Sequence, residues 1–117
     1  MALSNPLRIL TVDQDHTVRI ALEGELDRAT VPKLARELAE CDRRRTALVV
    51  IDLSGLEFLD AAGFRVLLEF GRRLRDSGRR LRLVNASRQI RRILKVVASM
   101  HAADMLDDWL EGPAFEP

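Results

Sequence analysis

Apolar and polar residues alternate near the start of the chain, and this pattern predicts two strands. Residues 7–12 form the first candidate. In residues 16–23, Val18, Ile20 and Leu22 fall on one face, with polar or small residues on the other. The link over residues 13–15 fits a hairpin with a loop of about three or four residues. We therefore expect the fold to begin with an antiparallel pair.

Helical spacing of apolar residues begins after Thr30, which is a good helix N-cap with Pro32 in the first turn. Leu34, Leu38 and Cys41 then recur at the spacing of one helix face. The pattern predicts a first helix over residues 30–41 that packs this stripe against the core.

The rest of the chain alternates between strand and helix patterns. Residues 47–53 are apolar without alternation, which is typical of a central strand covered on both faces. A helix over 62–75, a strand over 80–84 and a helix capped by Ser87 follow. This order predicts a single α/β domain with a mixed sheet of four to five strands and right-handed crossovers. The pattern is ambiguous from Ser99 onward, and we expect residues 112–117 to be frayed.

Composition narrows the class of protein. The 117 residues fit one domain, and an aromatic content of 4% predicts an aliphatic core. The single cysteine, Cys41, allows no intramolecular disulfide, which suits a reducing compartment. The chain does not begin with a signal-peptide pattern, and its longest apolar run, 47–51, is too short to span a membrane. We expect a soluble, cytoplasmic protein.

Charge is distributed unevenly along the chain. Residues 1–71 carry a net −3, residues 72–95 carry +9 and residues 96–117 carry −5. The basic block is either a surface that faces a partner or the solvated faces of two helices and a strand. Nucleic-acid binding is the weaker interpretation, because the block has few aromatic residues and no recognition-helix signature.

Residues 58–64, FLDAAGF, form an abrupt corner between the central strand and the second helix. Asp60 is placed to cap that helix by accepting from backbone N–H groups near Ala62 and Gly63. Corners of this shape often present a nucleophile, a phosphate site or a docking surface. This one presents two alanine methyl groups instead.

Three stretches together resemble the STAS domain family, and more closely its stand-alone members, the anti-sigma factor antagonists: EGELDRATVPKL, VVIDLSGLEFLDAAGFRVLL and RLRLVNASRQIRRIL. The resemblance implies a STAS domain over residues 7–106, followed by a C-terminal tail over 107–117. It also implies a partner, an ATP-binding anti-sigma factor with a kinase fold. That kinase phosphorylates a serine or threonine after the corner aspartate in typical members, and the unphosphorylated form binds it and frees the sigma factor.

Ala61 occupies the position of that hydroxyl in this chain, so the usual site cannot be phosphorylated. The resemblance then implies a module that is permanently competent to bind. We expect the partner-binding residues to be Asp27, Ser54, Asp60, Ala61, Ala62, Gly63, Phe64 and Leu68.

Each polar candidate also has a purely structural interpretation. Asp27 could bind loop amides, Asp60 could be a helix cap alone, and Ser54 could bond the backbone of a 52–55 turn. Gly63 could serve close packing, and Phe64 with Leu68 could be core rather than an anchor for a partner.

Catalysis is poorly supported, because His16 and His101 have no nucleophile spaced around them and Cys41 falls on an apolar stripe. No phosphate loop or metal-ligand spacing occurs, so we expect no cofactor and no metal. Besides the anti-sigma partner switch, the alternative is a STAS subunit of a larger assembly, such as a lipid ABC transporter or a stress-signalling complex. The sequence leaves a homodimer open.

Overall fold

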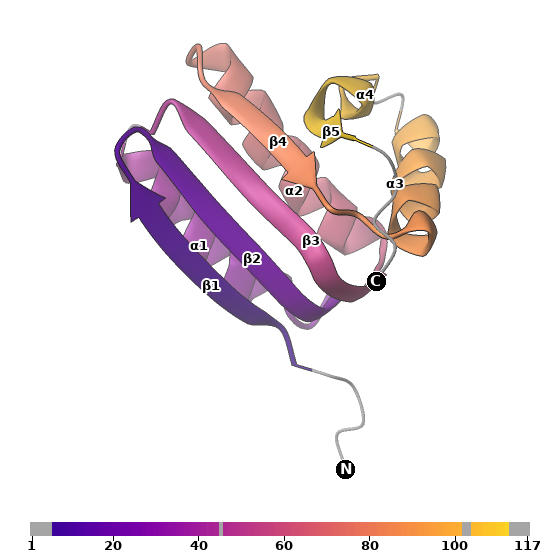
Figure 1. The fold of residues 1–117 in the computed structure, drawn as a ribbon. Coiled ribbons are helices and arrows are strands. Elements are labelled where there is room, and N and C mark those ends of the chain that lie inside the picture. Colours follow the sequence, from indigo (N-terminus) through magenta and orange to yellow (C-terminus); the bar gives the residue numbers. More distant parts are fainter. Residues whose placement is uncertain (1–5, 45, 102–103, 113–117) are drawn as a thin grey trace.

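A computed structural model describes residues 6–44, 46–101 and 104–112 as an α/β domain with one five-stranded sheet (Figure 1). The strands lie in the order β1-β2-β3-β4-β5. The prediction of a single α/β domain with a mixed sheet is confirmed. In chain order the elements are β1 (Arg8–Gln14), β2 (Thr17–Leu26), α1 (Val31–Arg43), β3 (Leu48–Leu59), α2 (Ala61–Asp76), β4 (Arg80–Val84), α3 (Arg88–Met100), α4 (Leu106–Trp109) and β5 (Leu110–Glu111).

The sheet opens with the predicted hairpin, in which β1 and β2 are antiparallel, and its other neighbouring strands are parallel. The hairpin is tighter than predicted, because the pairing runs to Gln14 and Thr17 and leaves two residues in the turn. Asp15 there adopts a positive φ of 59°, a conformation that aspartate tolerates better than most residues. The predicted loop of three or four residues is therefore wrong.

Strand β3 continues to Leu59, well past the predicted end at residue 53. The expected turn at 52–55 is instead an irregularity within the strand. Partners shift from Ala21–Asp52 to Glu23–Gly55, which inserts one extra residue into β3, as in a β-bulge. A second shift lies between the partners of Gly24 and Glu25. The bulged strand β3 therefore ends one residue before Asp60.

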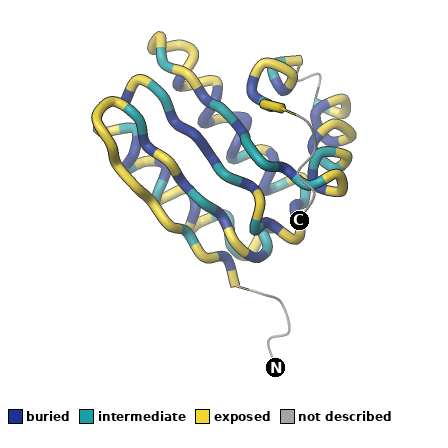
Figure 2. Tube along the Cα trace, in the orientation of Figure 1, coloured by how far each residue is buried: buried dark blue, intermediate teal, exposed yellow. Residues whose placement is uncertain are grey.

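The core lies between the sheet and the helices, and α1 and α2 run behind the sheet in Figure 1. Every second residue of β2 is buried, from Val18 to Leu26, which confirms the predicted alternation. In β3 the expectation of cover on both faces holds in part, because Val50 is buried while Leu48 and Asp52 on the same face are half-buried. Figure 2 shows the buried positions concentrated in β2, β3 and the helices.

Two of the three predicted helix caps form as expected. Asp60 and Ser87 each accept from the N–H three residues later, and the Ser87 oxygen lies 3.1 Å from the Ile90 nitrogen. Thr30 stands at the N-cap position of α1, but its side chain makes no cap hydrogen bond. Its hydroxyl donates to the Glu25 carbonyl at 2.8 Å and accepts from the Asp27 N–H at 2.9 Å. Thr30 therefore stabilises the loop between β2 and α1 through these two hydrogen bonds.

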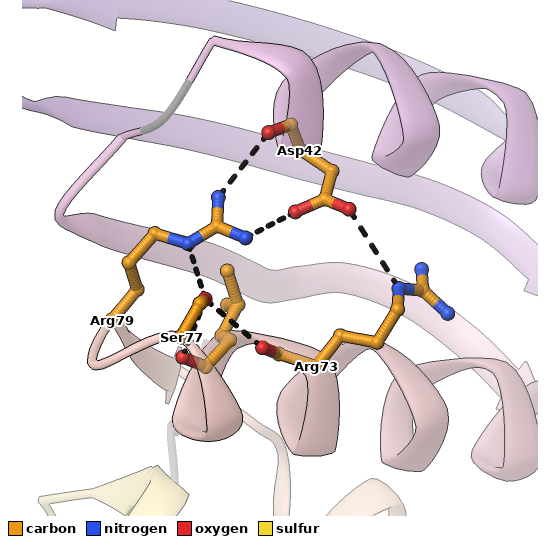
Figure 3. Close-up of polar contacts among 5 residues, drawn as sticks. Asp42, Arg73, Ser77 and Arg79 are labelled. Atoms are coloured by element: carbon orange, nitrogen blue, oxygen red, sulfur yellow. Dashed lines mark hydrogen bonds and ion pairs between the residues drawn. The ribbon is translucent and has the colours of Figure 1, made fainter.

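A polar network connects the C-terminal ends of α1 and α2 (Figure 3). The Asp42 carboxylate bridges Arg79 and Arg73, and Arg79 also donates from Nε to the Ser77 hydroxyl at 2.7 Å. The basic block of residues 72–95 is thus divided among α2, β4 and α3, with several of its arginines in ion pairs. This arrangement fits the interpretation of the basic block as the solvated faces of two helices and a strand better than its interpretation as a single surface for a partner.

Residues after 106, interpreted from the sequence as a tail, pack on the domain as far as Gly112. Leu106 and Trp109 are buried, and β5 pairs with the end of β4. Trp109 lies against Gly71 of α2, where an added Cβ would come within 2.2 Å of the indole. We therefore propose that the domain extends to at least residue 112. Of residues 112–117, which we expected to be frayed, 113–117 lie outside the described residues.

Candidate functional site

Within the corner, the single residue Asp60 links the end of β3 to the start of α2. Asp60 is extended, with φ −111° and ψ −176°, and its Oδ1 accepts from the Gly63 N–H at 2.9 Å. Its own N–H donates to the Leu26 carbonyl at 3.2 Å, at the end of β2. The predicted cap is confirmed, and it satisfies one of the N–H groups that a helix start leaves unpaired.

The second Asp60 oxygen has a role that the sequence did not indicate. Oδ2 accepts from the Arg28 N–H at 3.1 Å, so one carboxylate joins the start of α2 to the loop between β2 and α1. The sequence offered no signal for this bond, because the two residues are 32 positions apart. The start of α2 and this loop therefore form one surface, which we call the corner surface: Arg28, Ala29, Asp60, Ala61 and Ala62.

Asp27 lies next to this surface, but its carboxylate is turned into its own loop. Oδ1 accepts from the N–H groups of Ala29 and Thr30 at 3.0 and 3.1 Å. The interpretation of Asp27 as a ligand for loop amides is confirmed. Asp27 thereby shapes the loop that Asp60 holds.

The three residues that open α2 differ in exposure. Ala61 is exposed, Ala62 is half-buried and Gly63 is buried. A Cβ on Gly63 would lie 2.7 Å from the Leu26 carbonyl oxygen, so glycine here allows α2 to pack against the end of β2. The packing interpretation of Gly63 is therefore supported, and Ala61 is the residue that faces solvent.

Phe64 and Leu68 are core residues, with 1% and 3% of their surface exposed. The Phe64 ring lies 6.0 Å from the His101 ring, measured between centroids. Their predicted role as anchors for a partner is wrong, because neither side chain reaches the surface. Among the described residues, the exposed aromatic side chain is Phe58, at 43%. Its exposure is hard to predict from the sequence, because the bulged end of β3 does not follow simple alternation.

Ser54 is exposed in the irregular part of β3, and its contacts are with Asp52 rather than with the corner. The Ser54 N–H donates to Asp52 Oδ1 at 3.0 Å. Arg19 and Asn85 also donate to this carboxylate, at 3.0 and 3.2 Å. Burial raises the pKa of Asp52, but the hydrogen bonds from Ser54, Asn85 and Arg19 outweigh it and hold the pKa below its ordinary value of 3.8.

This lowered pKa predicts how Asp52 contributes to stability as pH changes. A carboxyl whose pKa is lower when folded stabilises the protein above its unfolded pKa and loses that contribution as pH falls. The gap in unfolding free energy between the wild type and Asp52→Asn should therefore narrow from pH 7 to pH 3, as measured by urea unfolding.

Asn85→Gly serves as the matched variant, because it removes one donor, leaves the carboxylate and tolerates the positive φ of 60° at this position. The difference in unfolding free energy between this variant and the wild type should also narrow from pH 7 to pH 3. At pH 7 this difference should be smaller than the one for Asp52→Asn. A gap for Asp52→Asn that stays constant from pH 7 to pH 3 would contradict the assignment.

Metal-ligating and nucleophilic side chains among the described residues bear on whether the site can perform catalysis. No group of three or more His, Cys, Asp or Glu side chains is placed to hold a metal ion in 6–44, 46–101 and 104–112. Cys41 is buried on the apolar face of α1, and burial raises the pKa of its thiol, which disfavours the nucleophilic thiolate. Across the same residues, no helix has both the length and the apolar character needed to cross a membrane.

The chain matches one protein-family model and several solved structures. Residues 9–106 match the family described as "Mlab, STAS domain". An anti-sigma factor antagonist from Mycobacterium paratuberculosis is 26% identical, with a TM-score of 0.74 over 91% of this chain and 94% of that one. A variant of RsbS from Moorella thermoacetica is also 26% identical, with a TM-score of 0.66 over 77% of each chain.

The unphosphorylated form of the anti-sigma factor antagonist SpoIIAA shares the fold at 21% identity, with a TM-score of 0.70 over 92% of this chain and 88% of that one. Among curated proteins, no match was found.

Proposed function

Because the chain belongs to the STAS domain family, we propose that it is an anti-sigma factor antagonist-like binding module that docks on a kinase-type anti-sigma factor. The similarity to the Mycobacterium paratuberculosis antagonist, over nearly the full length of both chains, supports this proposal. The partner would hold either this protein or its sigma factor, so binding here would release the sigma factor without any catalysis.

The observation that carries the proposal is the double role of Asp60. Its two oxygens fix the start of α2 and the β2–α1 loop in one arrangement before any partner arrives. Preorganised surfaces bind with a smaller loss of conformational entropy. The corner surface then offers a partner the exposed Ala61, whereas Phe64 and Leu68 are buried.

Ala61 determines how such a module would be regulated. We place it at the position where typical members of the family carry the phosphorylated hydroxyl. A methyl group cannot accept phosphate, so the corner surface would stay permanently in the binding-competent state. Control would then come from the amount of this protein or from its partner.

We predict that Ala61→Asp weakens binding to the anti-sigma partner by at least about tenfold, which corresponds to 1.4 kcal/mol. The added carboxylate places charge in a close-packed interface. It would also lie in the first turn of α2, where the helix dipole favours an anion, so the fold should remain intact. The partner is first recovered from native cells by affinity capture and mass spectrometry, and its affinity is then measured by calorimetry.

Ala39→Asp is the matched control, because Ala39 is an exposed alanine in the C-terminal half of α1. Its affinity should equal that of the wild type. Capture of a kinase-fold, ATP-binding protein in near-equal amount supports the proposal, and equal affinity of Ala61→Asp and wild type would remove the corner from the docking site. Ala61→Ser should accept phosphate from ATP if the captured partner is an active kinase.

A second candidate, a STAS subunit of a larger assembly, is favoured by the absence of a hydroxyl on Ala61. A structural joint needs the docking surface and no phosphorylation. Capture of a transporter subunit or a large multi-protein complex, with no kinase-fold protein, would favour this function.

A further inference from the structure

The outer edge of β1 is an exposed strand edge. In the sheet order β1 lies at the end, so among the described strands β2 is its one neighbour. Six of its seven residues are exposed, and Figure 2 shows this strand in the exposed colour over nearly its whole length. Two of its exposed side chains are large and apolar: Leu10 at 54% and Val12 at 58%.

This edge lacks most of the devices that keep strand edges from pairing. Such devices are proline, lysine, a bulge or a very short strand. β1 contains neither proline nor lysine, and it pairs with β2 in seven consecutive positions without a register shift. Its two charged residues already have partners, because Arg8 lies 3.8 Å from Glu23 and Asp13 lies 3.3 Å from Arg44.

We propose that β1 pairs antiparallel with β1 of a second copy of this chain, about a two-fold axis at Thr11. Thr11 is the midpoint of β1, so this register pairs all seven residues. It sets Leu10 opposite the partner's Val12, and by symmetry Val12 opposite the partner's Leu10. The apolar side chains that β1 exposes to solvent would then cover each other, as a self-complementary two-fold interface requires.

The register follows from the side-chain faces and charges. Leu10 and Val12 both lie opposite odd-numbered residues of β2, Ala21 and Arg19, and share a face of the sheet. A shift of one residue would place Leu10 and Val12 opposite odd-numbered residues of the partner's β1, which belong to its other face. A shift of two would leave residues at the ends of β1 unpaired. In the proposed register Arg8 meets the partner's Gln14, and no like charges lie directly opposite, an arrangement that would destabilise the pair.

The proposed dimer does not depend on the proposed function. Strand β2 separates β1 from β3, which leads into the corner. The two corner surfaces of a dimer would therefore remain available, one on each copy. A second copy is the occupant that fits, because the same seven residues supply both halves of the complementarity.

The first test is the oligomeric state of the wild type and of Val12→Lys by sedimentation equilibrium over a dilution series. The wild type should show a monomer–dimer equilibrium, and Val12→Lys should weaken it by at least about tenfold, because a desolvated charge would lie in the pair. Val96→Lys is the matched control, since Val96 is an exposed valine on α3 at 54%. It should dimerise like the wild type.

The second test is the register. Thr11→Cys should give a disulfide-linked dimer on mild oxidation, because directly opposite Cα atoms in an antiparallel pair lie about 4.5–5.5 Å apart, within reach of a disulfide. Leu10→Cys alone should not cross-link, since its own copy lies two residues further along the strand. A wild type that stays monomeric at millimolar concentration, a dimer that survives Val12→Lys, or equal cross-linking of both cysteine variants would overturn the proposal.

Discussion

Replacing Gly71 with alanine is expected to lower the free energy of unfolding by about 1–3 kcal/mol, the usual cost of overpacking a core. A loss of stability is unusual for this substitution, because alanine in a helix interior normally stabilises a protein by about 1 kcal/mol relative to glycine. Here the added Cβ would meet the Trp109 ring at 2.2, 2.5 and 2.8 Å, so the indole must leave its place on α2. Urea unfolding would measure the loss, and emission from the single tryptophan should shift to longer wavelength.

The control for this prediction is the same substitution in a Trp109→Ala background. Without the indole, the cost of Gly71→Ala should vanish and change sign, leaving a gain of up to about 1 kcal/mol from helix propensity. If Gly71→Ala is equally harmful in both backgrounds, then contact with Trp109 is not the reason for glycine at this position.

Asp60→Ala is expected to reduce both stability and partner binding. Loss of a side-chain cap costs about 1 kcal/mol, and the Arg28 N–H loses its acceptor as well, so we expect a total of about 1–3 kcal/mol. Binding should weaken further than stability alone explains, because the β2–α1 loop would no longer be held against α2. Urea unfolding and calorimetric titration with the captured partner separate the two effects.

Asp60→Asn distinguishes the two oxygens. Its amide oxygen can still accept from Gly63, while its NH₂ group would face the Arg28 N–H and repel it. We expect Asp60→Asn to keep most of the stability and lose much of the affinity. Loss of stability equal to that of Asp60→Ala would show that the bond to Arg28 contributes to folding rather than to the binding surface.

The sequence predicted the elements of this domain well because most of them have one buried face. The alternation around Val18, Ile20 and Leu22, and the helical spacing of Leu34, Leu38 and Cys41, follow directly from burial on one side. The strand β3 was harder to predict, because its bulges add residues that break the alternation beyond Leu53. The predicted turn at Ser54 failed for the same reason.

The site was predicted less completely than the fold. A helix cap such as Asp60 is a local feature and can be recognised from neighbouring residues, but its bond to Arg28 depends on how β2 and β3 pair. The exposure of a side chain likewise depends on tertiary packing and cannot be predicted from neighbouring residues alone. Phe58 and Phe64 both flank the corner in sequence, and only the packing of α2 on the sheet determines that Phe64 is buried while Phe58 is not.

The position of Trp109 near the end of the described chain also bears on synthesis. The apolar surface over Gly71 and the free side of β4 are covered by α4 and β5, which are synthesised after the other described elements. While the ribosome is still adding residues 106–111, the emerging domain has an open strand edge and an uncovered groove. Incomplete chains with such surfaces are prone to aggregate, and they are the species that chaperones bind. A chain that stops before Trp109 should therefore be a chaperone substrate, although every residue of the corner surface is already present.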